Sequence, residues 1–443
     1  NFIPEYGKLV LVRSDVIPNL ADLANQTGLT GRIAYASDYG LSRSLINGNN
    51  HNFAPRVGLA WRPFGGTRTV IRSGYGIFYA SAAENHVRND LGNTFPFAVS
   101  QTFQRNTKSP GKLTLNNPFP DAMAKFDGVN NTAGYELNAP AQYLQSWNFT
   151  IEHEVLSSIA LEMAYVGSKG THLGRRFNYN QPYRSPEYQL PEGGFLKPFQ
   201  EFNQLNYYSF GANSSYNAAM FTLRKRFTRS TFFRLNYVFS KSIDDASQMF
   251  GAGDGGDGGA QDARNLGLER GRSDWDNRHA LTMSFVSDIP VFGRNRFLSG
   301  WQFAGSGRLY SGQPFTPKIS NAQLDQGEAS RPDRIAKGTL PNPNPDNWFD
   351  VSAFPVVPLG AYRFGNSGRN ILDGPGYVSF NFSLMKKFRI RERDNVQCRW
   401  EVFNSLNHPN LRLPENAVNA INVGTITAAD PGRTMQIALK YIF

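Results

Sequence analysis

Arginine and lysine residues recur at polar positions inside alternating, otherwise apolar segments of this sequence of 443 residues. Cations in such positions can bind anionic solutes or an acidic protein surface. They can also pair with acids on neighbouring strands of a sheet. Acids at equivalent positions are fewer, namely Glu152, Glu154, Glu162 and Glu401. We favour internal pairing over specific anion binding for the eight cations Arg56, Arg72, Arg224, Arg234, Arg308, Lys387, Arg399 and Lys440.

An aspartate- and glycine-rich stretch from Asp244 to Asp262 is a candidate calcium site. Calcium prefers several oxygen ligands on flexible backbone, which this composition offers. The stretch lacks the order Asp-x-Asp-x-Asp-Gly with a closing Glu. We therefore interpret it as a glycine-rich surface loop.

No residue pattern nominates a catalytic centre. We find no nucleophile elbow, no phosphate-binding loop and no carboxylate pair at a defined spacing. The histidines are scattered, and the single Cys398 excludes a disulfide framework or a cysteine-based zinc site. The sequence therefore predicts a protein that is not an enzyme and has no cofactor.

Composition excludes several protein classes. The chain is too long for one ordinary compact core, so it forms several domains, a repeat array or one large barrel. It has 13% aromatic residues and 42 glycines, too aromatic for a disordered chain and too glycine-rich for a helical one. The net charge of +11 comes without a basic helix, so we do not expect nucleic-acid binding. No apolar run approaches the ~18 residues of a transmembrane helix.

The elements that must position the charged residues are β-strands, because apolar and polar residues alternate with a period of two. For example, Phe233 and Leu235 alternate with Arg234 and Asn236. The same pattern predicts about eleven long strands, near 54–61, 69–80, 141–155, 159–167, 215–227, 231–240, 278–288, 300–311, 376–388, 395–404 and 433–443.

One apolar and one polar face fit a soluble sandwich or a membrane barrel, and two features favour the barrel. Several segments exceed ten residues, whereas soluble strands commonly have ~5–6 and a tilted spanning strand needs ~9–11. Aromatic residues such as Phe227 and Phe388 lie at strand ends, where the interfacial girdles of barrels sit. The sequence therefore predicts an all-β fold, a portion of a transmembrane antiparallel β-barrel. We expect the eight cations to face its lumen, and Phe233 and Leu235 to face lipid.

Short and long connections alternate, as in outer-membrane barrels with short periplasmic turns and long extracellular loops. We expect residues 1–53 to form an extracellular loop or hairpin region with a short strand at 8–12. Residues 54–443 would form the barrel part, in the bacterial outer membrane. The start shows no signal peptide, so one has been removed or lies far upstream. The predicted long extracellular loops are 81–140, 168–214, 241–277, 312–375 and 405–432.

Two histidine-containing stretches are better explained by a structural role than by a metal-binding or catalytic one. In 275–279 we expect Trp275 to anchor the barrel rim and Asp276 to pair with Arg278. The stretch 407–410 (NHPN) is a turn signal, because proline lacks a ladder N–H and asparagine tolerates unusual φ. The chain closes on an alternating strand with Tyr441 and Phe443, which looks like the signal that the bacterial barrel-assembly machinery reads.

Eight short motifs follow one another in the barrel part: PRVGLAW at 55–61, RSGYGIFY at 72–79, YVGSKG at 165–170, DNRH at 276–279, SGQPFT at 311–316, FGNSGRN at 364–370, GPG at 374–376 and EVFNSLNHPN at 401–410. In this order they resemble TonB-dependent outer-membrane receptors, specifically the large Oar-like branch common in soil bacteria such as acidobacteria. The resemblance implies a 22-stranded barrel with an N-terminal plug. It also implies energised uptake of a scarce nutrient, whose siderophore, glycan or peptide class is not readable.

This sequence departs from that family by lacking a plug, a TonB-contacting segment and about half the strands. Energised transport is therefore implied for a parent polypeptide, as its C-terminal barrel half. The implied partners are outer-membrane lipid, the barrel-assembly machinery, and the missing plug and barrel half, from the same polypeptide or a second chain. A TonB complex would act through the missing part. The alternatives are a barrel-anchored adhesion or structural protein and a passive porin.

An odd number of strands also predicts that the chain does not close on itself. Single-chain bacterial barrels have even strand counts, and an open sheet edge in lipid leaves backbone groups unsatisfied. We therefore expect the strands at 54–61 and 433–443 to pair with strands absent from this sequence.

Overall fold

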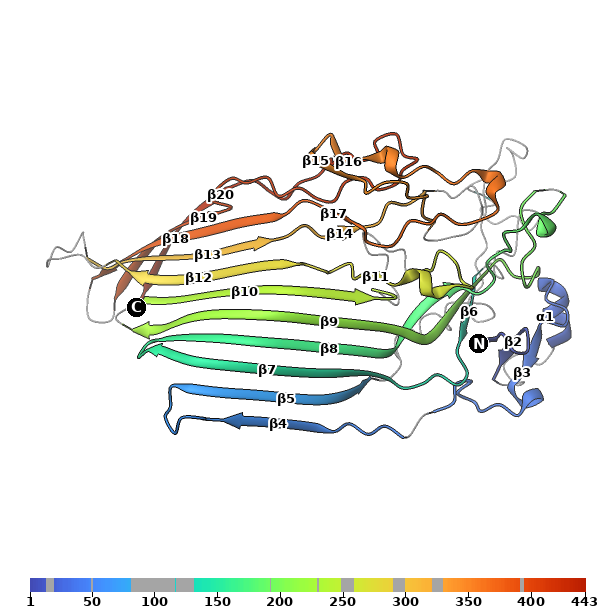
Figure 1. The fold of residues 1–443 in the computed structure, drawn as a ribbon, viewed down its shortest axis with the longest axis horizontal. Coiled ribbons are helices and arrows are strands. Elements are labelled where there is room, and N and C mark those ends of the chain that lie inside the picture. The colour runs from blue at the N-terminus through green and yellow to red at the C-terminus, as the bar shows by residue number, and fades with distance from the viewer. Residues whose placement is uncertain are drawn as a thin grey trace.

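The computed structural model describes residues 1–12, 20–48, 51–80, 116, 131–191, 193–228, 231–247, 259–289, 299–320, 330–390 and 394–443. One large sheet dominates this part of the chain, and its main strands lie side by side in chain order (Figure 1). Each strand of this path is antiparallel to its neighbours. The path from edge to edge is β20-β19-β18-β13-β12-β10-β9-β8-β7-β5-β4.

The eleven strands of the path correspond one to one to the predicted strands. They form because alternating sequences can bury one face, in lipid or in protein, while the other face keeps its polar groups hydrated. Their bounds are β4 (Arg56–Trp61), β5 (Thr69–Ala80), β7 (Gln142–Leu156), β8 (Ile159–Asn178), β9 (Gln204–Thr228), β10 (Thr231–Asp244), β12 (His279–Asp288), β13 (Trp301–Tyr310), β18 (Tyr377–Arg389), β19 (Asn395–Phe403) and β20 (Thr434–Ile442).

The two ends of the sheet differ in their connections. At one end, which we call the turn end, successive strands follow closely, as where β7 ends at Leu156 and β8 begins at Ile159. The C-terminus lies at this end, and the long connections and their folded lobes gather at the opposite, loop end (Figure 1). This separation is the arrangement that the sequence predicted.

Strands β8 and β9 are longer than predicted, so the predicted bounds of the loop at 168–214 were wrong. They have 20 and 25 residues, and their ladder continues to Asn178 opposite Asn206. The segment 168–214, predicted as a loop, therefore begins and ends in strand, at 168–178 and 204–214, and only 179–203 connects the two. At ~3.3 Å per residue, this hairpin projects well beyond a span of ~9–11 residues. A short strand inside predicted loop 81–140, β6 (Asn131–Tyr135), pairs in parallel with the start of β9.

Residues 1–12 and 20–48 form an N-terminal lobe at the loop end. It contains β1 (Phe2–Ile3), β2 (Lys8–Leu11), α1 (Leu20–Thr27), β3 (Ile33–Tyr35) and the 3-10 helix η1 (Ala36–Tyr39). The predicted strand at 8–12 is thus present, in a hairpin with β1, and β3 adds to it in parallel. The lobe's core includes Phe202 and Leu205 from the β8–β9 region, so the lobe packs on that hairpin. No helix in the described ranges is long and apolar enough to cross a membrane.

A second lobe, the C-terminal lobe, is built from residues 259–278, 311–320, 330–376 and 404–433. Buried Phe315, Phe349, Phe354 and Leu372 form its core. Its elements are η4 (Leu266–Glu269), β11 (Gly271–Arg272), β14 (Pro314–Phe315), β15 (Thr339–Asn344), β16 (Asn347–Phe349), η5 (Val351–Ala353), η6 (Leu359–Ala361) and β17 (Leu372–Asp373). The connection between β8 and β9 carries η3 (Pro186–Tyr188). The predicted loops 241–277, 312–375 and 405–432 thus converge in one folded body.

The large sheet is open, with β4 at one edge and β20 at the other. Within the described ranges no ladder joins these two strands, so the expectation that the chain does not close on itself is confirmed. An open edge exposes a row of backbone N–H and C=O groups, which hydrocarbon cannot satisfy.

Candidate functional site

The eight predicted cations all lie on one face of the sheet. Residues directly opposite each other in a ladder point to the same face, so the face can be followed from strand to strand. Arg224 lies opposite Arg234, and Arg308 opposite Thr282, which is opposite Asn236. The ladders connect every one of the eight to this set, and Glu152, Glu154, Glu162 and Glu401 as well. We call it the cationic face.

Internal pairing on this face is partly realised. Glu152 Oε2 lies 2.8 Å from Nη1 of Arg72, and its Oε1 lies 2.9 Å from Nη2 of Arg224. These three side chains come from β5, β7 and β9, so the carboxylate bridges across the intervening β8. Arg399 pairs with Glu401 along β19 at 3.3 Å. Arg56 instead covers the ring of Phe78 at 4.7 Å from its centroid.

The opposite face is apolar and largely uncovered. Leu235 lies between Leu223 and Met283 in the ladder, on the side away from Arg234. Leu439 on the edge strand β20 is 74% exposed. A soluble protein rarely exposes so extended an apolar surface, whereas lipid covers it in a barrel.

Glycine at 305 lets aromatic rings pack closely on the apolar face. A Cβ atom there would lie 2.7 Å from the Phe285 ring and 2.8 Å from the Phe382 ring. These rings and that of Phe303 form a cluster with centroids 5.2 to 6.4 Å apart. This part of the apolar face is therefore filled by aromatic side chains from three adjacent strands.

Buried ion pairs tie the segments of the C-terminal lobe together. Arg331 Nη1 lies 2.7 Å from Glu269 Oε2, with the two side chains only 2% and 7% exposed. Arg369 binds the carboxylate of Asp244, which is equally buried. Sequence reasoning treated Asp244 as a loop acid; the structure corrects this, because it ends β10 and neutralises an arginine. Arg369 lies in the motif at 364–370, and nothing in that motif indicates that Asp244 is its partner.

The candidate calcium stretch offers no metal site within the described residues. Residues 248–258 lie outside them, and no group of three or more His, Cys, Asp or Glu side chains that suits a metal occurs in the described ranges. The expected pair of Asp276 and Arg278 is present at 3.6 Å. Asn404 and Asn407 adopt positive φ angles of 47° and 53°, and the N–H of Asn407 bonds the carbonyl of Asn404, so the turn lies at 404–407, directly before most of the predicted stretch 407–410.

An ion pair between Asp333 and Arg363 on the surface of the C-terminal lobe joins the segments near residues 333 and 363. Asp333 accepts hydrogen bonds of 2.7 Å from both Nη atoms of Arg363 and a third from the backbone N–H of Asn366. The Arg363 guanidinium therefore holds the pKa of the Asp333 carboxyl below its ordinary value. Asp333 is mostly covered, so this pair is screened less than two fully exposed charges would be.

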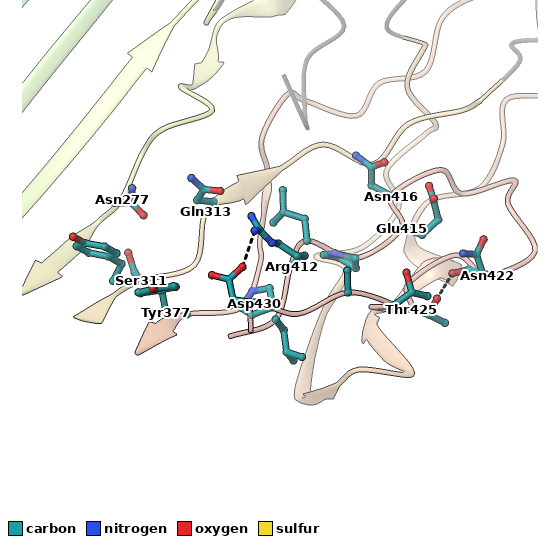
Figure 2. A pocket seen from close by; sticks show the side chains of 18 of the residues that line it. Asn277, Ser311, Gln313, Tyr377, Arg412, Glu415, Asn416, Asn422, Thr425 and Asp430 are labelled. Atoms are coloured by element: carbon teal, nitrogen blue, oxygen red, sulfur yellow. Dashed lines mark hydrogen bonds and ion pairs between the residues drawn. The ribbon is translucent and has the colours of Figure 1, made fainter. Parts of the chain in front are cut away.

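A pocket of about 740 Å³ lies where the C-terminal lobe meets the ends of β13 and β18. Arg308, Tyr310 and Tyr377 line it from the sheet, and all three lie on the cationic face. The opposite wall comes from Lys318 and from a hairpin over 411–429, which Figure 2 shows with Arg412 pointing toward Asp430. The cationic face therefore forms one wall of the pocket.

The sequence identified only Arg308 among the charged residues of this pocket. Lys318, Arg412, Glu415 and Asp430 were missed, because they stand in irregular segments where no period indicates which way a side chain points. The sequence feature that could have pointed to these four residues is their nearness to the motifs at 311–316 and 401–410. Chain segments that contain or follow these motifs line the pocket.

The last strand, β20, places Tyr441 on the apolar face at the turn end, and Phe443 follows directly after the strand. Their rings stack with centroids 5.8 Å apart. Both side chains are well exposed, at 52% and 90%. This geometry leaves the pair accessible at a free sheet edge.

Comparisons with known proteins place this fold. A protein-family model described as an outer membrane beta barrel domain matches residues 7–436. The outer membrane transporter YddB from Escherichia coli is similar with a TM-score of 0.50 and 10% identity, over 89% of this chain and 41% of that chain. The siderophore receptor PiuA from Acinetobacter baumannii has a TM-score of 0.40 and 10% identity, over 88% of this chain and 35% of that chain. The search of curated proteins found no match.

This chain therefore spans less than half the length of the solved structures to which it is similar. At this identity the likeness shows the fold alone, which is that of an outer-membrane barrel. Because the family match covers 7–436 and the alternating sheet has the apolar face that a barrel wall needs, the chain belongs to the outer membrane beta barrel domain family and resides in the bacterial outer membrane.

Proposed function

We propose that this chain forms part of the barrel wall of a TonB-dependent receptor, of the Oar-like branch, that takes up a scarce nutrient. The single observation that carries the proposal is the open sheet, with eleven strands on its main path and two folded lobes at its loop end. Capture of a solute from outside needs such structured loops above a lumen. The fold likeness to an outer membrane transporter supports this assignment.

In this proposal the open edges are completed by further strands. Edges β4 and β20 would each pair with a strand outside this sequence, because unpaired backbone in hydrocarbon costs several kcal/mol per group. The cationic face then lines the lumen, where it meets water, a solute or an acidic plug surface. Tyr441 and Phe443 would be read by the barrel-assembly machinery before the last edge is closed. A plug and its TonB contact belong to the completed protein.

Energised uptake can be separated from the two alternatives by one measurement on cells. We would delete the gene in its host, restore it on a plasmid, and follow depletion of solutes from spent medium by mass spectrometry. The proposal expects a restricted set of solutes to be depleted only by the restored strain. It also expects an uncoupler of the proton-motive force to abolish that depletion.

Each other result argues for a different function. Depletion that persists with the uncoupler indicates a passive porin. No gene-dependent depletion, together with loss of cell aggregation or surface attachment in the deletion strain, indicates an adhesion or structural role. Either outcome would overturn energised uptake.

A further inference from the structure

We propose that the pocket at the loop end binds a small hydroxylated carboxylate, such as an acidic sugar, through Arg308 and Lys318. The inference rests on the proposed function, because it places a captured solute on the lumen side of the barrel wall. All residues of the proposed carboxylate site belong to this chain.

The charges in the pocket are unequally matched. Arg412 pairs with Asp430 at 2.7 Å, and Glu415 accepts a hydrogen bond of 2.9 Å from the backbone N–H of Ala417. Within the described residues, the side chains of Arg308 and Lys318 have neither a hydrogen-bond nor an ion-pair partner, although both line the pocket. Glu415 keeps its negative charge, so the three cations and two carboxylates of the lining sum to a net charge of +1. Arg308 and Lys318 can both donate charge-assisted hydrogen bonds, which are the strong ones, to an anionic group that enters the pocket.

The rest of the lining suits hydroxyl groups and a ring. Tyr310 and Tyr377 stack with centroids 5.9 Å apart and form a flat aromatic wall against which a sugar face can lie. The other polar groups are neutral amides and hydroxyls, which donate to and accept from hydroxyls. They are Asn277, Ser311, Gln313, Asn416, Asn422, Thr425 and Thr427.

Hydrogen bonds within the protein hold the backbone of the pocket walls. Backbone hydrogen bonds of 2.9 Å join Arg412 to Ala428 and Glu415 to Thr425, which closes the hairpin over the pocket. The backbone of Lys318 is bound on both sides, to Asn416 at 2.9 Å and to Val418 at 2.8 Å. A preformed site loses less ordering free energy on binding than a mobile loop does. The volume of about 740 Å³ lies in the range of small-molecule sites.

Direct binding to the whole polypeptide, purified in detergent, tests this inference. The probes are D-galacturonate and tri-galacturonate, with citrate as a hydroxy acid that has no ring. D-galactose and the methyl ester of galacturonate are matched neutral probes. We expect calorimetry or ligand-detected NMR to show binding of an acidic probe at least about tenfold tighter than its neutral counterpart, which is ~1.4 kcal/mol. Ring and acyclic acids distinguish a sugar site from a general hydroxycarboxylate site.

Substitutions locate the binding. Arg308→Gln and Lys318→Gln should each weaken binding of the acidic probe about tenfold or more. The affinity for the neutral probes should stay unchanged. Arg234→Gln, on the same face but outside the pocket lining, is the matched control and should change affinity less than twofold. Heat-modifiable migration on gels shows that each variant is folded.

Three results would overturn the proposal: equal binding of acidic and neutral probes, unchanged affinity in both pocket variants, or an equal loss in Arg234→Gln. The last would assign anion attraction to the whole face. The assay needs no TonB, so binding can hold while energised uptake fails. Uptake can likewise hold while all acidic probes fail to bind, and the two failures are therefore distinguishable.

Discussion

Glu152 pairs with two arginines that come from strands on either side of it, and it lies directly opposite Glu162 on β8. Replacing it with glutamine leaves Arg72 and Arg224 unpaired on one side of the sheet. We expect Glu152→Gln to lower the free energy of unfolding by ~0.5–1 kcal/mol, because cross-strand ion pairs are worth that much and these side chains are partly hydrated.

Glu162→Gln is the matched control for this change. It removes one of two like charges that face each other, so we expect no loss of stability or a small gain. Denaturant unfolding of refolded protein in detergent, followed by tryptophan fluorescence, measures both. Equal destabilisation by the two variants would show that the bridge through Glu152 contributes nothing.

The ion pair of Asp333 with Arg363 makes the C-terminal lobe sensitive to acid. Because the folded pKa of Asp333 is lowered, its contribution is complete above the unfolded pKa of ~3.9 and is lost as pH falls through the folded value. Hydrogen exchange over 330–366, corrected for intrinsic rates, should therefore speed up at low pH. In Asp333→Asn it should be faster at neutral pH and change less with acid. Protection in this variant identical to wild type at neutral pH would contradict the assignment.

Residue faces were predictable from sequence, and residue partners were not. The period of two fixed on which side Arg72, Glu152 and Arg224 lie, since a strand alternates regardless of its neighbours. Which acid meets which base depends on register and on strands far along the chain. The pair of Arg369 and Asp244, 125 residues apart, shows why no local pattern could reveal it.

At the scale of elements, β10 offers a sharp test of which face meets lipid. Leu235 and Asn236 are neighbours on opposite faces of this strand. Leu235→Arg should cost ~2–4 kcal/mol near the bilayer midplane, whereas Asn236→Arg should cost much less because the lumen is wet. Unfolding in lipid vesicles measures both. A larger cost for Asn236→Arg would reverse the faces of the whole sheet.

Strands were predicted well because each carries its own signal, and the lobes were predicted only as loops. The segments 179–203 and 330–376 lack a period, and their fold depends on contacts with other segments, such as Phe315 with Phe349 at 5.6 Å between ring centroids. The extension of β8 and β9 was missed because most of residues 168–178 and 204–214 are half-buried or buried by protein, as at Phe177 and Tyr208, and need no lipid-facing alternation.

For the whole molecule, the orientation in the membrane follows from the two ends of the sheet. We expect the loop end to face outside and the turn end to face the periplasm. In a Cys398→Ser background, Asn344→Cys on β15 and Phe64→Cys in the turn between β4 and β5 report opposite ends; Phe64 is 81% exposed. An impermeant maleimide should label Asn344→Cys on intact cells and Phe64→Cys only after permeabilisation. The reverse pattern would invert the topology.

The buried ion pairs of the C-terminal lobe also limit how such a protein can diversify. Arg331 with Glu269 and Arg369 with Asp244 each join segments that are distant in sequence. Replacing one of these loops with that of a relative would remove one partner of a buried ion pair. The other partner would remain as an unpaired buried charge, at a cost of ~3–5 kcal/mol. New ligand preferences would therefore arise either by point changes at the pocket wall or by exchange of the entire lobe as a cassette.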